Sequence, residues 1–171
     1  REVHIELVAT EDCLPDEDLI NRIIDAASKG ALVGMVCNLV ADAQRLYQTI
    51  AARVEERGVE IPVDIFHARY IYADRQLHEQ RVKDHYGKDA DRDLGRILVA
   101  TQVIEQSLDL DFDWLITQIC PVDLLFQRLG RLHRHERDNR ASVFASASRA
   151  VVLVPTDEED FGLHQVIYAS A

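Results

Sequence analysis

The residues from Leu32 to Val54 read LVGMVCNLVADAQRLYQTIAARV and predict a β-strand followed by an α-helix. Leu32 to Val36 is a short continuous apolar run, which is typical of a strand buried on both faces. After a polar turn at 37–38, apolar residues recur at the spacing of one helix face: Val40, Ala43, Tyr47, Ile50, Ala51 and Val54. The segment is therefore predicted to be one βα unit.

The same alternation continues on both sides of this unit. Val3 to Val8 predicts an earlier strand, and Pro15-Asp16 opens a helix that Gly30 ends. Later helices are predicted from Asp74 to about His85 and from Pro121 onward. Strands that alternate with helices form a mostly parallel sheet covered on both faces, so we expect an α/β fold with three αβα layers. The later strands are predicted at Val63–Phe66, Ile97–Ala100, Trp114–Ile119 and Val151–Val154.

The composition limits what the chain can be. Its 171 residues suit one well-packed domain, so we expect a single domain over residues 1–171, with a mobile segment at 136–149. No apolar run approaches the ~20 residues that span a bilayer, and no signal peptide is evident, so we expect a soluble protein without a membrane partner. The widely spaced cysteines predict buried thiols: Cys13, Cys37 and Cys120.

The formal net charge of -11 argues against binding nucleic acid through bulk positive charge. Any such contact is expected to be local. One arginine cluster interrupts the acidic sequence, and it predicts either a phosphate contact or a solvated basic helix end: Arg128, Arg131, Arg134, Arg137 and Arg140.

The segment Gln127 to His135 reads QRLGRLHRH and follows the helix predicted from Pro121. At ~100° per residue, Gln127, Arg131 and Arg134 fall within an arc of roughly 60°. The opposite face would be apolar, with Val122, Leu125, Phe126, Leu129 and Leu132. We therefore expect one helix that packs inward and presents an amide and two guanidiniums outward. Guanidiniums bind phosphate oxygens bidentately, so the pattern suits a polyphosphate; the alternative is a solvated arginine-rich helix.

A second segment, Ala100 to Asp113, reads ATQVIEQSLDLDFD and begins at the carboxyl end of a predicted strand. Open α/β sheets bind their ligands at that edge. Thr101 and Ser107 offer hydroxyls to phosphates, and Asp109 can accept a hydrogen bond from a ribose hydroxyl. The alternative is that these residues only cap and turn the chain.

A metal site is a further hypothesis that the histidines raise. His133 and His135 form an H-x-H pair, with His67 and His164 as distant candidates. Such a pair without further spaced ligands does not predict a metal site, so none is assigned. His133 is expected instead to pack beside the arginines.

These segments resemble superfamily 2 helicases, and within them the CRISPR-associated helicase-nucleases of type I interference. ATQVIEQSLDLDFD is similar to motif V, and QRLGRLHRH is similar to motif VI, which reads QRxGRxGR in many other superfamily 2 helicases. His133 stands where that pattern has glycine, and the Leu-His-Arg-His ending is typical of the CRISPR-associated branch. Cys37-Asn38 resembles motif IV, His67-Ala68-Arg69 resembles the following nucleic-acid contact, and the stretch 161–168 also resembles the family.

The resemblance implies a RecA-like domain, the second of two in a helicase. Arg131 and Arg134 would then be arginine fingers that complete an ATP site, and Gln127 would contact the phosphates or position the attacking water. Asp109 would hold the ribose. The backbone of single-stranded DNA would contact Asn38, Arg69, Thr101, Gln102 and Ser107.

No GxxxxGK[ST] phosphate loop and no DExH-type segment occurs in this sequence. ATP and Mg²⁺ would therefore be bound mainly by a first RecA-like domain outside this chain, and the chain alone is expected to be inactive and to hold no cofactor. The resemblance further implies an HD nuclease domain before Arg1, an accessory domain after Ala171, a guide-RNA surveillance complex as partner and a prokaryotic cytoplasmic location. Two alternatives stay open: another superfamily 2 DNA or RNA helicase, and a non-enzymatic RecA-like binding module.

Overall fold

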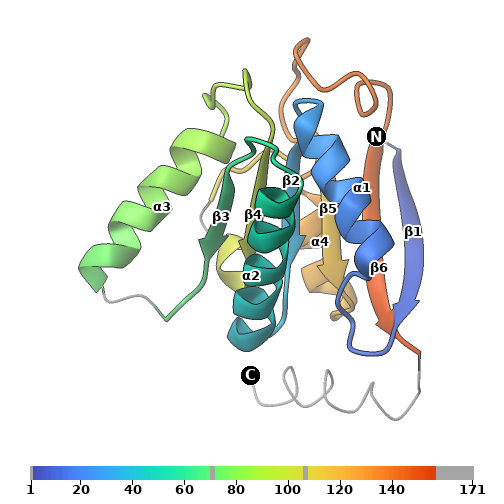
Figure 1. Cartoon of the computed structure of the whole chain (residues 1–171). Coiled ribbons are helices and arrows are strands. Elements are labelled where there is room, and N and C mark those ends of the chain that lie inside the picture. The colour runs from blue at the N-terminus through green and yellow to red at the C-terminus, as the bar shows by residue number, and fades with distance from the viewer. Residues whose placement is uncertain (1, 70–71, 106–107, 157–171) are drawn as a thin grey trace.

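The computed structural model describes residues 2–69, 72–105 and 108–156, and the described part contains one six-stranded sheet. Figure 1 shows the elements in chain order. They are β1 (Val3–Thr10), α1 (Glu17–Ser28), β2 (Leu32–Val36), α2 (Val40–Glu56), β3 (Val63–Phe66), α3 (Tyr72–Tyr86), β4 (Arg96–Ala100), the 3-10 helix η1 (Gln102–Ile104), β5 (Trp114–Gln118), α4 (Val122–Leu129) and β6 (Ser148–Pro155).

The strands lie in the order β1-β6-β5-β2-β4-β3, and each neighbouring pair is parallel. The predicted α/β class with a mostly parallel sheet is thereby confirmed. Because the strands share one direction, all their carboxyl ends meet at one edge of the sheet, at the bottom of Figure 1. We call this the carboxyl edge and the opposite one the amino edge.

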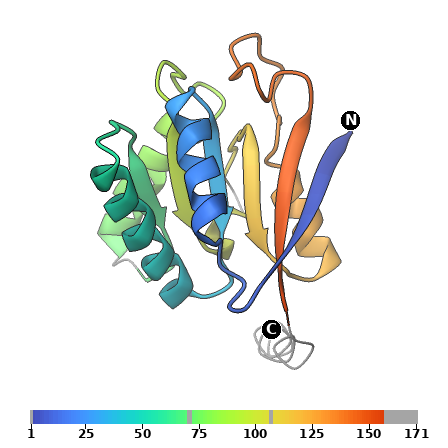
Figure 2. The ribbon, with the colours of Figure 1, turned by 45° about the vertical axis from the view of Figure 1, so that its right-hand side comes forward.

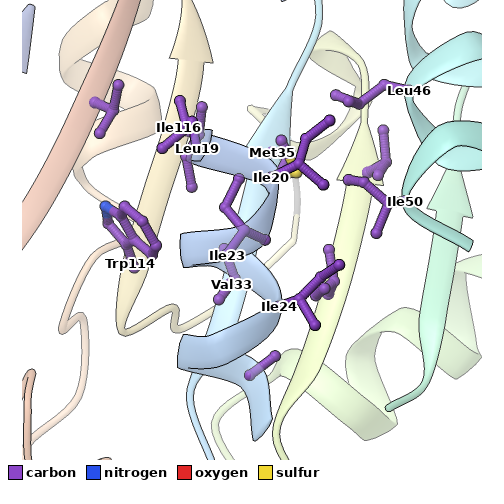
Figure 3. Close-up of a cluster of buried hydrophobic side chains, with 14 of the residues drawn as sticks. Leu19, Ile20, Ile23, Ile24, Val33, Met35, Leu46, Ile50, Trp114 and Ile116 are labelled. Carbon is purple, nitrogen blue, oxygen red and sulfur yellow. The ribbon is translucent and has the colours of Figure 1, made fainter. Parts of the chain in front are cut away.

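Helices cover both faces of the sheet and give the three predicted layers (Figure 2). On the first face, α1 and α2 cover the first core cluster, which contains Ile23 of α1, Ile50 of α2, and Val33, Met35 and Ile116 of the sheet (Figure 3). The spacing of the apolar residues in α1 explains this contact, because they form one continuous stripe: Leu19, Ile20, Ile23, Ile24 and Ala27.

The second face carries the second core cluster. There Val82 and Tyr86 of α3 pack with Leu110, Phe112 and Leu132. Phe112 lies directly on β2, because a Cβ added at Gly34 would come within 2.9 Å of three atoms of the phenyl ring. Glycine at position 34 therefore lets the chain segment around Phe112 approach the sheet.

The helix predicted from Pro121 through Arg134 is wrong in its length. Helix α4 ends at Leu129, and the chain then turns and runs alongside Phe112. The Phe112 amide donates to the Arg131 carbonyl at 2.8 Å, and the His133 amide donates to the Phe112 carbonyl at 3.0 Å. These bonds to a segment distant in sequence replace the next helical turn.

The predicted inward face of this helix is only partly right: Leu132 is buried and Leu129 packs against the second core cluster, but other members of the face are exposed. Val122 and Phe126 are 67% and 69% exposed, whereas Arg128 is fully buried. The reason is a buried carboxylate, Glu105, which lies opposite Arg128 and forms an ion pair with it. An ion pair of this kind sets the rotation of α4, which helical periodicity alone cannot reveal.

Cys13 and Cys37 are buried as predicted, and Cys120 is half-buried. In the described ranges, no helix combines the length and the hydropathy needed to cross a membrane. The segment 136–149 is tied to the core by ion pairs and by stacking of Phe144 on Trp114, with ring centroids 5.7 Å apart. Its mobility stays a prediction.

Candidate functional site

The carboxyl edge brings together four of the five predicted nucleic-acid residues. Asn38 follows β2, Arg69 follows β3, and Thr101 and Gln102 follow β4. Because these strands are neighbours in a parallel sheet, their ends lie side by side, as open α/β sheets require of a ligand site. Ser107 lies outside the described residues.

A buried polar network joins these strand ends, and its centre is Arg128. The Arg128 Nε donates to Glu105 Oε1 at 2.7 Å, and one terminal nitrogen donates to the hydroxyl of Thr117 at 2.7 Å. The other terminal nitrogen donates to Asn38 Oδ1 at 3.1 Å. A buried guanidinium is tolerated only when it is paired and hydrogen-bonded in this way. We call Asn38, Glu105, Thr117, Gln118 and Arg128 the carboxyl-edge network.

Within this network Asn38 is held on every side. Its backbone amide donates to Gln118 Oε1 at 2.6 Å, and its side-chain amide donates to the Ile119 carbonyl at 2.8 Å. Its own carbonyl accepts from Gln102 Nε2 at 2.7 Å. Asn38 is only 4% exposed, so the structure places this predicted DNA contact inside the edge.

A hollow of about 330 Å³ lies beside the network, between η1 and α3. Thr101 and Gln102 line it together with Arg75 and Glu79. Arg69 follows Ala68, a lining residue of the hollow, and is exposed. Its backbone amide donates to His67 Nδ1 at 3.3 Å. Burial lowers the pKa of His67, which favours the neutral imidazole that can accept this bond.

The predicted nucleotide residues do not share one helix face. Gln127 is exposed on α4, while Arg131, beyond the end of the helix, is buried and donates to the Ile104 and Glu105 carbonyls at 3.3 and 2.8 Å. Burial lowers the pKa of Arg131, and the nearby charge of Arg134 lowers it further. The helical-wheel argument is therefore corrected by the turn at Gly130.

Arg134 and Asp109 do come together. The Arg134 Nε lies 2.5 Å from Asp109 Oδ1, and His135 Nε2 lies 3.1 Å from the same carboxylate. The side chains of Arg134 and Asp109 are 40% and 50% exposed. Burial alone would raise the pKa of Asp109, but the hydrogen bonds from His135 and Arg134 outweigh it and lower this pKa. This exposed pair is the part of the candidate nucleotide site on the second face where two predicted residues are in contact.

A second charged group, at the amino edge, was missed by sequence reasoning. Arg92, Asp111, Asp113, Arg137 and Arg140 form what we call the amino-edge cluster. Arg92 lies 2.7 Å from Asp113 Oδ1, Arg137 lies 2.5 Å from Asp111 Oδ2, and Arg140 bridges both carboxylates at 2.9 and 2.8 Å. Both Asp side chains are fully buried.

The alternative of a solvated helix end is therefore wrong for most of the arginine cluster, and Arg134 is its exposed member, for which phosphate contact stays a prediction. Arg128 and Arg131 are buried, and Arg137 and Arg140 are paired with carboxylates. The available signal was the run of acids at Glu105, Asp109, Asp111 and Asp113, which stands about twenty residues before the arginines. Sequence alone does not show that the two runs lie side by side.

The described ranges hold no group of three or more His, Cys, Asp or Glu side chains arranged to bind a metal. His133 is buried and has a backbone φ of 45°, in the left-handed region that glycine adopts readily. Glycine, which the QRxGRxGR pattern has at this position, adopts such a φ without strain. His164 lies outside the described residues.

Comparison with known proteins gives one family. The model of the family "CRISPR-associated nuclease/helicase Cas3, C-terminal" matches residues 29–137. The CRISPR-associated endonuclease/helicase Cas3 of Escherichia coli (strain K12) is 50% identical over 165 residues, which cover 96% of this chain and 18% of that protein. The chain thus spans about a fifth of the length of this relative.

Solved structures agree with the family match. The crystal structure of T. fusca Cas3 has a TM-score of 0.82 and 30% identity, over 92% of this chain and 19% of that one. Structures of the same protein are described as its ATP, ADP and AMPPNP forms, and a further match at 31% identity and a TM-score of 0.75 is described as a CRISPR RNA-guided surveillance complex, pre-nicking. Helicase domain 2 of the DEAD-box protein Mss116p, at 15% identity and a TM-score of 0.60, shares the RecA-like fold.

Proposed function

The chain belongs to the C-terminal family of CRISPR-associated Cas3 nuclease/helicases, and from this premise we propose that it is the second RecA-like half of an ATP-dependent single-stranded DNA translocase. The observation that carries the proposal is the exposed pair of Arg134 and Asp109. Its guanidinium is suited to bind phosphate, and its carboxylate is suited to bind ribose. The two groups come from separate segments of the chain and lie on the outer side of the second core cluster.

The nucleotide would bind between this face and the first RecA-like domain. T. fusca Cas3 in its ATP, ADP and AMPPNP forms supports nucleotide use by the whole protein. In this proposal Arg134 exchanges its contact with Asp109 for the phosphates, and Asp109 then accepts from the ribose. Arg131 would be the second finger and Gln127 would act at the phosphates, while ATP and Mg²⁺ would be held mainly by the first RecA-like domain.

Single-stranded DNA would lie along the carboxyl edge. Arg69, Thr101 and Gln102 would contact its backbone beside the hollow, and Ser107 would add a hydroxyl. Asn38 would hold the carboxyl edge in shape and would not extend its side chain toward the DNA, because that side chain is bonded to Arg128 and Ile119.

The segment from Thr101 to Asp109 would couple the two sites. It begins at the proposed DNA edge and ends at the proposed nucleotide carboxylate, and Arg128 and Arg131 bond its middle residues, 104–105. A change at the nucleotide can therefore move the strand ends through these bonds, as nucleotide-driven closing of a cleft requires. The full protein would also carry an HD nuclease domain, as the name endonuclease/helicase of its relative suggests, and would have a guide-RNA surveillance complex as partner.

The direct test is Arg134→Ala in the full protein, assayed for DNA-stimulated ATP hydrolysis. Loss of an arginine finger is expected to lower kcat by ~10³ to 10⁵-fold. Arg45→Ala is the matched control, because Arg45 is also exposed and paired with a carboxylate, Asp12, at 2.9 Å. Normal turnover by Arg134→Ala would contradict the finger assignment.

The nucleic-acid substrate is tested by comparing stimulation by single-stranded DNA and by single-stranded RNA of matched length. The RNA alternative has one specific support, because the RecA-like relative Mss116p is described as bound to an RNA duplex. We expect stimulation by DNA. Stimulation by RNA alone would overturn the preferred substrate.

The chain of residues 1–171 by itself is expected to show negligible ATP hydrolysis, because its sequence contains no phosphate loop. The measurement is phosphate release with and without single-stranded DNA. Turnover at the rate of the full protein would contradict the assignment of this chain as half of a motor.

A further inference from the structure

Asp111 is a buried carboxylate that holds the segment carrying Arg134. Its Oδ1 accepts from the backbone amide of Arg134 at 2.9 Å. The same carboxylate accepts from Arg137 Nε at 2.5 Å and from a terminal nitrogen of Arg140 at 2.9 Å. Its own amide donates to the Tyr86 carbonyl at 2.8 Å, so Asp111 is itself fixed to the end of α3.

Hydrogen bonds also fix the backbone on both sides of Arg134. On the amino-terminal side, the amide of His133 is bonded to the Phe112 carbonyl, next to Asp111 in sequence. On the carboxyl-terminal side, Arg140 donates to the His135 carbonyl at 2.6 Å while it is paired with Asp111. The backbone before and at Arg134 is thus bonded to the segment 111–112, and the backbone after it is bonded to Arg140, which is paired with Asp111.

Asp113, the other carboxylate of the cluster, has different backbone partners from Asp111. It is equally buried and is paired with Arg92 and Arg140. Its second oxygen accepts from the Leu32 amide at 2.9 Å, so it ties the cluster to the start of β2. Asp111 bonds the backbone of Arg134 directly, whereas the side chain of Asp113 accepts from Leu32, Arg92 and Arg140.

We propose that Asp111 is a positioning residue, which sets the backbone of Arg134 so that its guanidinium reaches the phosphates of the bound nucleotide. The inference rests on the proposed function of Arg134 and names a second residue on which that function depends. Asp111 itself is fully buried and touches no ligand in this role. If the Asp111 carboxylate were removed, Arg134 would still be present but its guanidinium would be displaced. A small displacement is enough to impair a catalytic contact.

The test is a double-mutant cycle in the full protein with Asp111→Asn, Arg134→Ala and the combination. DNA-stimulated kcat is measured together with the thermal unfolding of each variant. If Asp111 acts through Arg134, Asp111→Asn alone lowers kcat at least ~10-fold but adds no further loss in the Arg134→Ala background. A merely structural role would lower kcat by the same factor in both backgrounds.

Asp113→Asn is the matched control, because it removes an equally buried charge from the same cluster. It is expected to lower the unfolding temperature as Asp111→Asn does, with a kcat loss that is equal whether Arg134 is intact or replaced by alanine. If Asp111→Asn does not fold, Asp111→Asn combined with Arg137→Gln restores the net charge of the cluster and takes its place in the cycle.

The outcomes separate the two proposals. Impaired turnover by Arg134→Ala, with losses that multiply when Asp111→Asn is added, would overturn the positioning role and leave the finger in place. Normal turnover by Arg134→Ala would overturn both.

Discussion

The carboxyl-edge network and the amino-edge cluster both bury arginines, but they stabilise them differently. In the network, Arg128 has one carboxylate partner and shares its other bonds with Asn38, Thr117 and the Gln118 carbonyl. In the cluster, three arginines share two carboxylates from one short segment, Asp111–Asp113. The network is therefore directional and joins strand ends, while the cluster is ionic and ties one segment down.

The network lies where DNA is proposed to bind, and its hydrogen bonds join the ends of β2 and β5. In the proposed function it would transmit a displacement from one strand end to the other. The cluster lies at the opposite edge, where its several ion pairs hold the turn of Arg134 in place. One region is suited to coupling and the other to fixing a position.

The strongest effect on stability is expected where the network is broken at its centre. Arg128→Met would leave Glu105 buried without its charge partner and is expected to destabilise the domain by about 3–5 kcal/mol. The measurement is denaturant unfolding, with exposed Arg45→Ala as a control that should cost at most about 1 kcal/mol. Arg128→Met combined with Glu105→Met should recover much of the loss, and failure to recover would contradict the ion-pair explanation.

A smaller effect is expected at His133, where the chain passes from the segment near the network to the segment near the cluster. Its φ of 45° is costly for a residue with a Cβ. Both His133→Ala and His133→Gly remove the imidazole, so their difference isolates the backbone. We expect the Gly variant to be more stable than the Ala variant by about 1 kcal/mol in denaturant unfolding. The reverse order would show that the left-handed turn is not retained.

The smallest expected effect is on the stability of the folded chain at acidic pH. Burial would raise the pKa of Asp111, but hydrogen bonds from Arg137 and Arg140 outweigh it and hold this pKa below its usual range. The unfolded chain therefore binds more protons just below pH ~4, and the stability that Asp111 contributes is present above that pH and is lost as the pH falls further. Unfolding measured from about pH 5 to about pH 2.5 should show a weaker pH dependence for Asp111→Asn than for the unaltered chain. Equal dependence would mean that Asp111 does not contribute to acid sensitivity.

Much of the fold was predictable because its signals are local. Leu32–Val36 and Val63–Phe66 were predicted with the bounds they have, since short apolar runs between polar turns specify buried strands. Other boundaries shifted: α3 starts at Tyr72 rather than Asp74, and β6 starts at Ser148 rather than Val151. The strand order was not predicted, because pairing between strands depends on contacts far apart in the sequence.

The candidate site was predicted in its residue types and in part of its geometry. Asp109 and Arg134 were both expected at the nucleotide and are in contact, and the strand-end residues share one edge. The expected alignment of Gln127, Arg131 and Arg134 was wrong, because the helix ends before Arg131. Their catalytic and binding roles stay predictions.

The α/β class, most strands and helices, and the family could all be read from the amino-acid sequence, because they follow from local periodicity and from two contiguous segments. The burial of individual arginines could not, because it depends on how distant segments pack together. The charge partner of Arg128 is 23 residues away and its amide partner, Asn38, is 90 residues away, so no local pattern encodes either contact. A guanidinium enters the interior only where such distant groups receive it, and that is a property of the folded chain.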